Sequence, residues 1–221
     1  MRLGYACLEI GAYERAVREL EGALEAATAT NLHQAIALAQ HNLGLALARV
    51  GRLDDAKRLE MAAINAFHAQ GDARLERASR IYYAEIVMLG GDLAGAGSEL
   101  QSLLDESHDR TPTRALALAS LARVRVRQKD AAAALACAEQ AIAMLEEFGG
   151  VDEGEALMRL AHVEALHLAD RIADATSALA TARTRLHDRA SRIADPALRT
   201  LFLETVPENK QTLSFGLPLK S

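Results

Sequence analysis

Apolar and small residues in the range 42–66 recur at the spacing of a helical hairpin. Leu47 falls in a first helical stretch, and Gly51 marks a bend after it. Ala56 and Ala63 follow seven residues apart, which places them on one face of a second stretch because seven residues make nearly two helical turns. The pattern therefore predicts two helices that pack through small residues.

The same pattern returns along the chain at nearly constant intervals. Marker alanines at the start of each second helix follow one another after 40, 40, 38 and 41 residues. Glycine occupies the bend in the first three copies, while Lys129 and Asp170 take its place in the last two. Such regularity indicates an internal repeat. It predicts units near residues 1–30, 31–70, 71–109, 110–150 and 151–194, with markers Ala16, Ala56, Ala96, Ala134 and Ala175.

A larger residue followed by a small one also lies seven positions before each of the first four bends. These pairs and the alanines resemble the tetratricopeptide repeat, whose first helix carries L-G and whose second carries spaced alanines. The resemblance covers about residues 1–185. It implies an all-α fold, a right-handed superhelix (solenoid) of about five long helical hairpins with a C-terminal capping helix. The pairs are Leu3-Gly4, Leu43-Gly44, Tyr83-Ala84 and Leu121-Ala122.

The interval near 40 residues is longer than the usual period of about 34. The extra length predicts long helices, with breaks at positions such as Gly71-Asp72 and Thr111-Pro112, where glycine ends a helix and Asp or Thr caps the next. Long-helix versions of this repeat are similar to those of bacterial regulatory proteins that sense peptides or partner domains. The resemblance therefore implies a binding scaffold.

Both ends of the chain carry further expectations. Met1 falls inside the first helix of a repeat, so we expect a segment of a longer protein. Asp195-Pro196 predicts a capping helix and a short following segment over residues 195–213, and residues 214–221 are predicted to be a mobile tail. The run from Arg199 to Asn209 resembles the ending R-x-x-F-L-x-x-V-P-E-N of large bacterial signalling proteins that carry a kinase or a STAND-type ATPase.

The amino-acid composition and charge argue against several classes of partner. Ala and Leu dominate and only 4% of the residues are aromatic, which favours helix over strand. The net charge of −5 argues against a nucleic-acid partner, which attracts basic proteins. No run approaches the roughly 18 apolar residues of a membrane span, and Cys7 and Cys137 fit small core residues in a reducing compartment. We expect a cytoplasmic protein without a membrane partner.

Enzymatic chemistry finds little support in the sequence. The nearest approach to a metal-binding pair is His162 and His167, which lie five residues apart and thus on different faces of a helix. No nucleophile is accompanied by a base and an orienting group. The sequence predicts no enzyme, no metal and no cofactor.

The resemblance to the tetratricopeptide repeat implies that the first helices line a concave groove and that a protein or peptide partner binds there. Arg123 and Arg127, four apart on one helix, suggest an anionic anchor, whereas Glu85 and Glu164 on flanking helices would neutralise Arg123 in an ion ladder. We favour the ladder. The candidate groove residues are Tyr5, His41, Leu45, Arg49, Ile81, Glu85, Met88, Arg123 and Arg127, with Glu9, Glu164 and His167 at the margins.

Two functions remain open from the sequence. The first is a protein-binding or peptide-binding scaffold, the regulatory repeat segment of a larger bacterial signalling protein. The alternative is an intramolecular spacer or self-association module without an external ligand, in which the apolar side of the first helix, including Leu3 and Tyr5, would mediate self-association.

Overall fold

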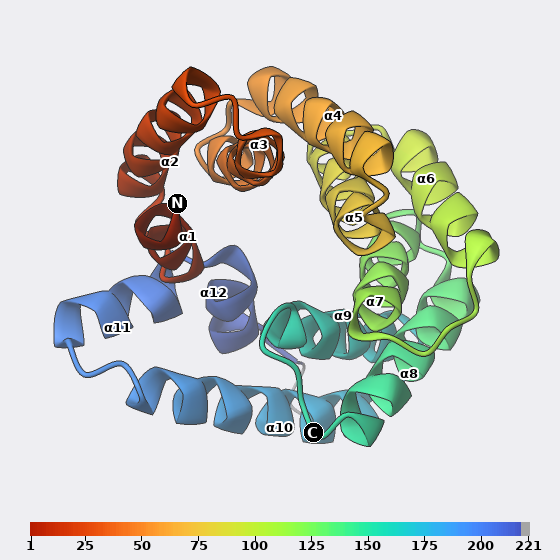
Figure 1. Ribbon diagram of the computed structural model, residues 1–221. Helices are drawn as coiled ribbons and strands as arrows, with labels where there is room; N and C mark the ends of the chain where they lie inside the picture. The colour runs from red at the N-terminus through yellow and green to blue at the C-terminus, as the bar shows by residue number, and fades with distance from the viewer. Residues whose placement is uncertain (218–221) are drawn as a thin grey trace. The chain divides into compact units, whose positions relative to one another are not determined.

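The computed structural model describes residues 1–217, and these residues form helices without any strand (Figure 1). The predicted all-α class is confirmed. Residues 218–221 of the predicted mobile tail lie outside the described part. The helices are α1 (Arg2–Glu9), α2 (Tyr13–Ala29), α3 (His33–Arg49), α4 (Leu53–Gln70), α5 (Ala73–Leu89), α6 (Leu93–Glu106), α7 (Pro112–Arg127), α8 (Ala131–Glu147), α9 (Glu155–Leu168), α10 (Ile172–Ser191), α11 (Pro196–Glu204) and α12 (Pro207–Ser214).

The chain divides into two compact units, Met1–Glu99 and Leu100–Ser221. In the first unit, α1 packs on α2 and α3 on α4, and α4 in turn contacts α5. In the second, α7 packs on α8 and α9 on α10. Within residues 1–217, no helix is both long and apolar enough to cross a membrane.

Small residues hold the paired helices together. The five marker alanines are fully buried, because a methyl group lets the facing helix approach closely while still excluding water. In the first unit the core includes Leu20, Leu43, Leu47 and Ala56, and a second cluster contains Ala63 and Phe67. The landmarks of the repeat are therefore packing positions. The fully buried markers are Ala16, Ala56, Ala96, Ala134 and Ala175.

The bends keep one backbone conformation even where glycine is lost. Gly51 has a φ of 83°, and Lys129 and Asp170 adopt φ values of 62° and 56° at the equivalent positions. The hydrogen bonds repeat as well: the amide of Arg52 donates to the carbonyl of Leu47 at 2.9 Å. Both features are typical of a glycine-type helix C-terminus. The bend therefore requires a left-handed backbone conformation whichever residue occupies it, and this conformation is energetically unfavourable for Lys129.

Replacing Lys129 with Gly should raise the free energy of unfolding by about 0.5–1 kcal/mol, because glycine adopts positive φ without a steric penalty. The matched control is Gln128→Gly at the neighbouring position, where φ is −77° and glycine should lower the stability by a similar amount. Urea unfolding of both variants measures the difference. Equal responses would show that the backbone conformation of this bend does not limit stability.

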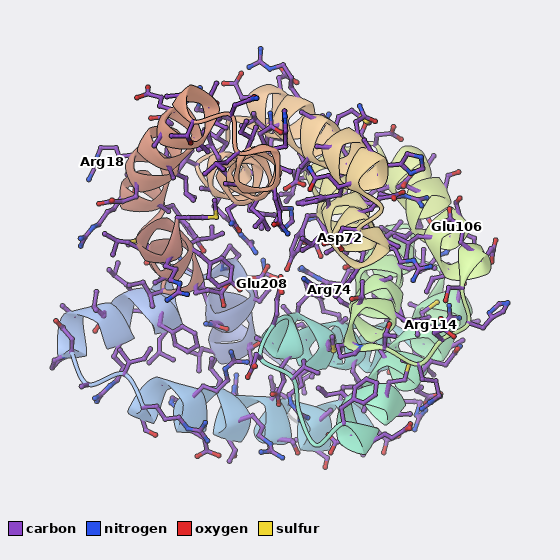
Figure 2. All side chains as sticks on the ribbon, viewed as in Figure 1. Arg18, Asp72, Arg74, Glu106, Arg114 and Glu208 are labelled. Atoms are coloured by element: carbon purple, nitrogen blue, oxygen red, sulfur yellow. The ribbon has the colours of Figure 1, made fainter. Side chains whose placement is uncertain are left out.

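Side-chain caps fix several helix ends where the sequence predicted them. The Asp72 carboxylate at the start of α5 accepts a hydrogen bond from the amide of Leu75 at 3.0 Å, and Gly71 ends α4 with a φ of 70° (Figure 2). Thr111 caps α7 by accepting from the amide of Arg114 at 3.1 Å. The Arg114 guanidinium in turn donates to the carbonyl of Leu104 at 2.8 Å and ties α7 to the end of α6.

The C-terminal region contains one more helix than the sequence predicted. Asp195 caps α11 by accepting from the amide of Ala197 at 2.8 Å. After a short turn, Pro207 begins α12, which continues to Ser214, a residue that the sequence analysis assigned to the tail. The Asn209 side chain donates to the carbonyl of Phe202 at 2.8 Å and holds the turn between α11 and α12. Helix α12 lies against α9 and α10 and contacts both (Figure 1).

Candidate functional site

The candidate groove residues of the first unit differ in their accessibility. His41, Ile81 and Met88 are buried, whereas Leu45 and Arg49 are half-buried. Tyr5 and Glu85 are half-buried too, and Glu9 is exposed. The sequence register placed Ile81 and Met88 among the groove positions, but their side chains lie in the interior, because apolar residues gain most from removal from water.

His41 belongs to a buried polar cluster that joins three helices of the first unit. Its Nδ1 lies 3.0 Å from Oε2 of Glu60 on α4 and 2.9 Å from Oγ of Ser79 on α5. The His41 ring also approaches Tyr82 and Phe67, with centroids 5.6 and 6.4 Å away. A role for His41 in packing therefore accounts for its position better than a role in ligand contact.

Glu60 supplies the carboxyl group of this cluster and is completely buried. Burial raises the pKa of its carboxyl group, although His41 and Ser79 oppose the rise. Its Oε1 accepts no hydrogen bond within the described residues and lies against Gly44, where an added Cβ would come within 3.1 Å of it. The repeat glycine of α3 thus makes room for a buried carboxyl group.

In the second unit, Arg123 of α7 lies between two polar partners. Its Nε donates to Oε2 of Glu164 on α9 at 3.0 Å, which is the Glu164 half of the ion ladder predicted from the sequence. Its Nη2 donates to Oε1 of Gln211 on α12 at 2.8 Å. Arg127, one turn further along α7, is exposed. Of the positions predicted to face the groove on α7, Arg123 therefore contacts a helix of the same chain.

The C-terminal end of α12 and the residue after it make further contacts with α10 and α9. Arg183 of α10 donates to the carbonyls of Leu213 and Phe215, both at 2.9 Å, and to that of Thr212 at 3.2 Å. The Phe215 ring meets His167 of α9 edge to face, with centroids 5.7 Å apart. We call the surface formed by Arg123, Glu164 and His167 the α7/α9 face.

The two histidines considered as metal ligands lie in different environments. His167 contacts Phe215, whereas His162 lies in a cleft of about 360 Å³ between α8, α9 and α10. Burial lowers the pKa of His162. No group of three or more His, Cys, Asp or Glu side chains in the described residues could hold a metal ion.

A second buried ion pair lies on the floor of that cleft. Arg159 of α9 is only 7% exposed at its side chain; its Nε donates to Oε1 of Glu155 at 2.8 Å and its Nη1 to Oε1 of Glu146 at 3.1 Å. Because these charges satisfy one another, the cleft presents no unpaired charge at Arg159. We assign Arg159 a structural role.

Comparison with solved structures identifies the type of fold. The Rap conjugation gene regulator of plasmid pLS20, solved with the Phr* peptide, matches with a TM-score of 0.68 and 16% identity over 97% of this chain and 63% of the regulator. A Rap protein complexed with Competence and Sporulation Factor matches with a TM-score of 0.63 and 16% identity, over 95% of this chain and 59% of the other.

A third similar structure is the putative kinesin light chain of Podosopora anserina, built of nearly identical TPR-like repeats. It matches with a TM-score of 0.59 and 18% identity over 83% of this chain and 91% of the other. The TPR-like helical repeat fold is therefore confirmed. This chain spans about three fifths of the two Rap chains. No protein-family model matches the sequence, and no curated protein matches it significantly.

Three residues with important contacts in the structure were not identified from the sequence. Glu60 was not singled out, although it shares the helix face of the buried Ala56 and Ala63. Gln211 and Arg183 become important only through α12, whose polar sequence lacks the periodicity of an amphipathic helix. The Pro207-Glu208 start, with proline at the first helical position, is the signal that could have found this helix.

Proposed function

We propose that this chain is a protein-binding or peptide-binding scaffold that uses the exposed faces of its first helices. The observation that supports this proposal most strongly is that α12 of the same chain lies on the α7/α9 face. Arg123, Glu164 and His167 were selected from the repeat register as groove positions. Arg123 contacts Gln211 of α12 and pairs with Glu164, and His167 contacts Phe215 directly after α12. A surface that holds a helix of its own chain has the shape and polar groups to hold a partner segment.

The chemistry of the face favours a polar partner with aromatic anchors. Arg123 supplies a donor, Glu164 supplies acceptors, and His167 offers a ring edge for aromatic contact. Leu45 and Arg49, half-buried on α3, are the candidates for an apolar and basic contact in the first unit. Binding through such a surface relies on a few well-placed side chains.

A peptide array tests the proposal with two groove variants and two controls. Arg123→Glu and Leu45→Asp should each weaken or change the set of captured peptides. The controls, Arg185→Glu on α10 and Met61→Asp on α4, introduce the same charge changes at exposed positions of second helices and should leave the set unchanged. If all four variants capture the peptides of the original chain equally well, the first helices do not form the binding surface.

We also propose that the scaffold acts within a larger cytoplasmic bacterial signalling protein. The resemblance of the run from Arg199 to Asn209 to the ending R-x-x-F-L-x-x-V-P-E-N supports a kinase or STAND-type ATPase partner domain. Reading the complete coding sequence around this chain tests the proposal. An open reading frame that encodes no such domain would contradict it.

Self-association is the second candidate, and exposed apolar residues of α1 favour it. Leu3 is 49% exposed and Met1 37% exposed. Burial of such side chains against a second copy would remove apolar surface from water. Light scattering over a range of concentrations should detect a dimer that Leu3→Glu abolishes. A monomer at every concentration would exclude this candidate.

A further inference from the structure

Helix α12 is too short to be stable by itself. It has eight residues, and isolated helices of that length are marginal in water. Its buried residues are Glu208, Asn209 and Thr212, all of them polar, and Leu213 is only half-buried, so apolar packing accounts for its position only in part. The contacts with α7, α9, α10 and α11 therefore hold α12 in place.

One of these contacts involves a side chain of α12, and a second involves the aromatic residue directly after the helix, at a fixed spacing from the first. Gln211 accepts a hydrogen bond from Arg123, and Phe215, four residues later, meets the ring of His167. Glu164 already offsets the charge of Arg123 through two hydrogen bonds. The pair therefore favours a neutral acceptor such as an amide, because a carboxylate there would also face the negative charge of Glu164.

The third contact is to backbone carbonyls at the C-terminal end of the helix, so it does not depend on the side chains there. The last carbonyls of a helix lack partners within the helix and carry a partial negative charge. Arg183 donates to two such carbonyls, those of Thr212 and Leu213, and to the carbonyl of Phe215 directly after the helix. Any segment that ends a helix at this point offers the same acceptors.

We propose that α12 is a resident ligand of the α7/α9 face, and that the face recognises in a partner a helical segment with glutamine in its last turn and an aromatic residue four positions later, directly after the helix ends. The inference rests on the proposed binding function and names the partner that the face accepts. The partner helix ends over Arg183, places its amide on Arg123 and its ring on His167. Because α12 is tethered, it competes at a high effective concentration, so the partner binds fully only when α12 leaves.

Fluorescence anisotropy of a labelled peptide with the sequence of residues 205–217 tests the inference on the full chain. The peptide should bind at least about tenfold more tightly to a chain carrying Gln211→Ala and Phe215→Ala than to the original, because the weakened α12 competes less well. The matched control carries Lys210→Ala and Ser214→Ala, at exposed positions of α12, and should bind as the original does.

Variants of the peptide test whether its glutamine and phenylalanine side chains are recognised. Replacing its glutamine with Ala or Glu, or its phenylalanine with Ala, should weaken binding to the Gln211→Ala, Phe215→Ala chain about tenfold or more. Equal affinities for all these peptides would overturn the proposed recognition. Equal affinity for the original chain and the weakened chain would overturn the resident-ligand role.

Hydrogen exchange on the original chain gives an independent readout. Saturating peptide should increase the exchange of the α12 amides, and unchanged exchange with the peptide bound would overturn the proposed competition. The proposed function fails separately: if Arg123→Glu still alters the peptide array while the 205–217 peptide does not bind, the scaffold function stands and only this inference falls.

Discussion

Replacement of His41 with Phe should lower the free energy of unfolding by about 3–5 kcal/mol, as expected when one partner of a buried pair is removed. Glu60 is completely buried, and His41 Nδ1 lies 3.0 Å from its Oε2. The phenyl ring keeps most of the volume of the imidazole but donates no hydrogen bond, so the Glu60 carboxyl loses its principal partner. Urea unfolding followed by circular dichroism measures the loss.

A double-mutant cycle provides the control for this prediction. Glu60→Leu in the His41→Phe background removes the carboxyl group that lost its partner, and the double variant should be less destabilised than the sum of the single variants. The coupling should exceed about 1 kcal/mol. Strictly additive effects would show that the two side chains do not stabilise each other.

Replacement of Arg159 with Leu should cost about 3–5 kcal/mol, because Glu155 would stay in the interior without a cation. Arg159 is 7% exposed and Glu155 11% exposed at their side chains, so water compensates little for the missing partner. The leucine fills part of the space of the arginine and limits the effect of a cavity. Urea unfolding again measures the change.

Arg171 offers a matched control for Arg159. It too contacts two carboxylates, Glu139 at 2.7 Å and Asp174 at 2.8 Å, but its side chain is 44% exposed. Arg171→Leu should therefore change the stability by no more than about 1 kcal/mol. If the two leucine variants are equally stable, burial is not what gives the Arg159 pair its importance.

The repeat was predictable because packing of paired helices demands small residues at fixed intervals. Ala134 and Ala175 are fully buried although their bends lack glycine. Lys129 and Asp170 still adopt positive φ there. The alanine spacing was therefore a stronger signal than the glycine, because close helix approach depends on the alanine while the bend tolerates other residues.

The site was less predictable because it depends on contacts between distant segments. Arg123 and Glu164 followed from equivalent positions on stacked helices, and their ion pair is present. Gln211 lies 88 residues from Arg123 in sequence, and no local pattern links the two. Ile81 and Met88 were assigned to the groove because the repeat register does not tell which groove positions become covered.

Hydrogen exchange of the α12 amides in the unliganded full chain is the most direct test of the occupied α7/α9 face. Protection in α12 should clearly exceed that of an unstructured segment, and it should fall in Arg183→Ala and Arg123→Ala variants while protection in α3 and α4 stays unchanged. Unprotected α12 amides in the original chain would contradict the account, because the face would then hold no helix.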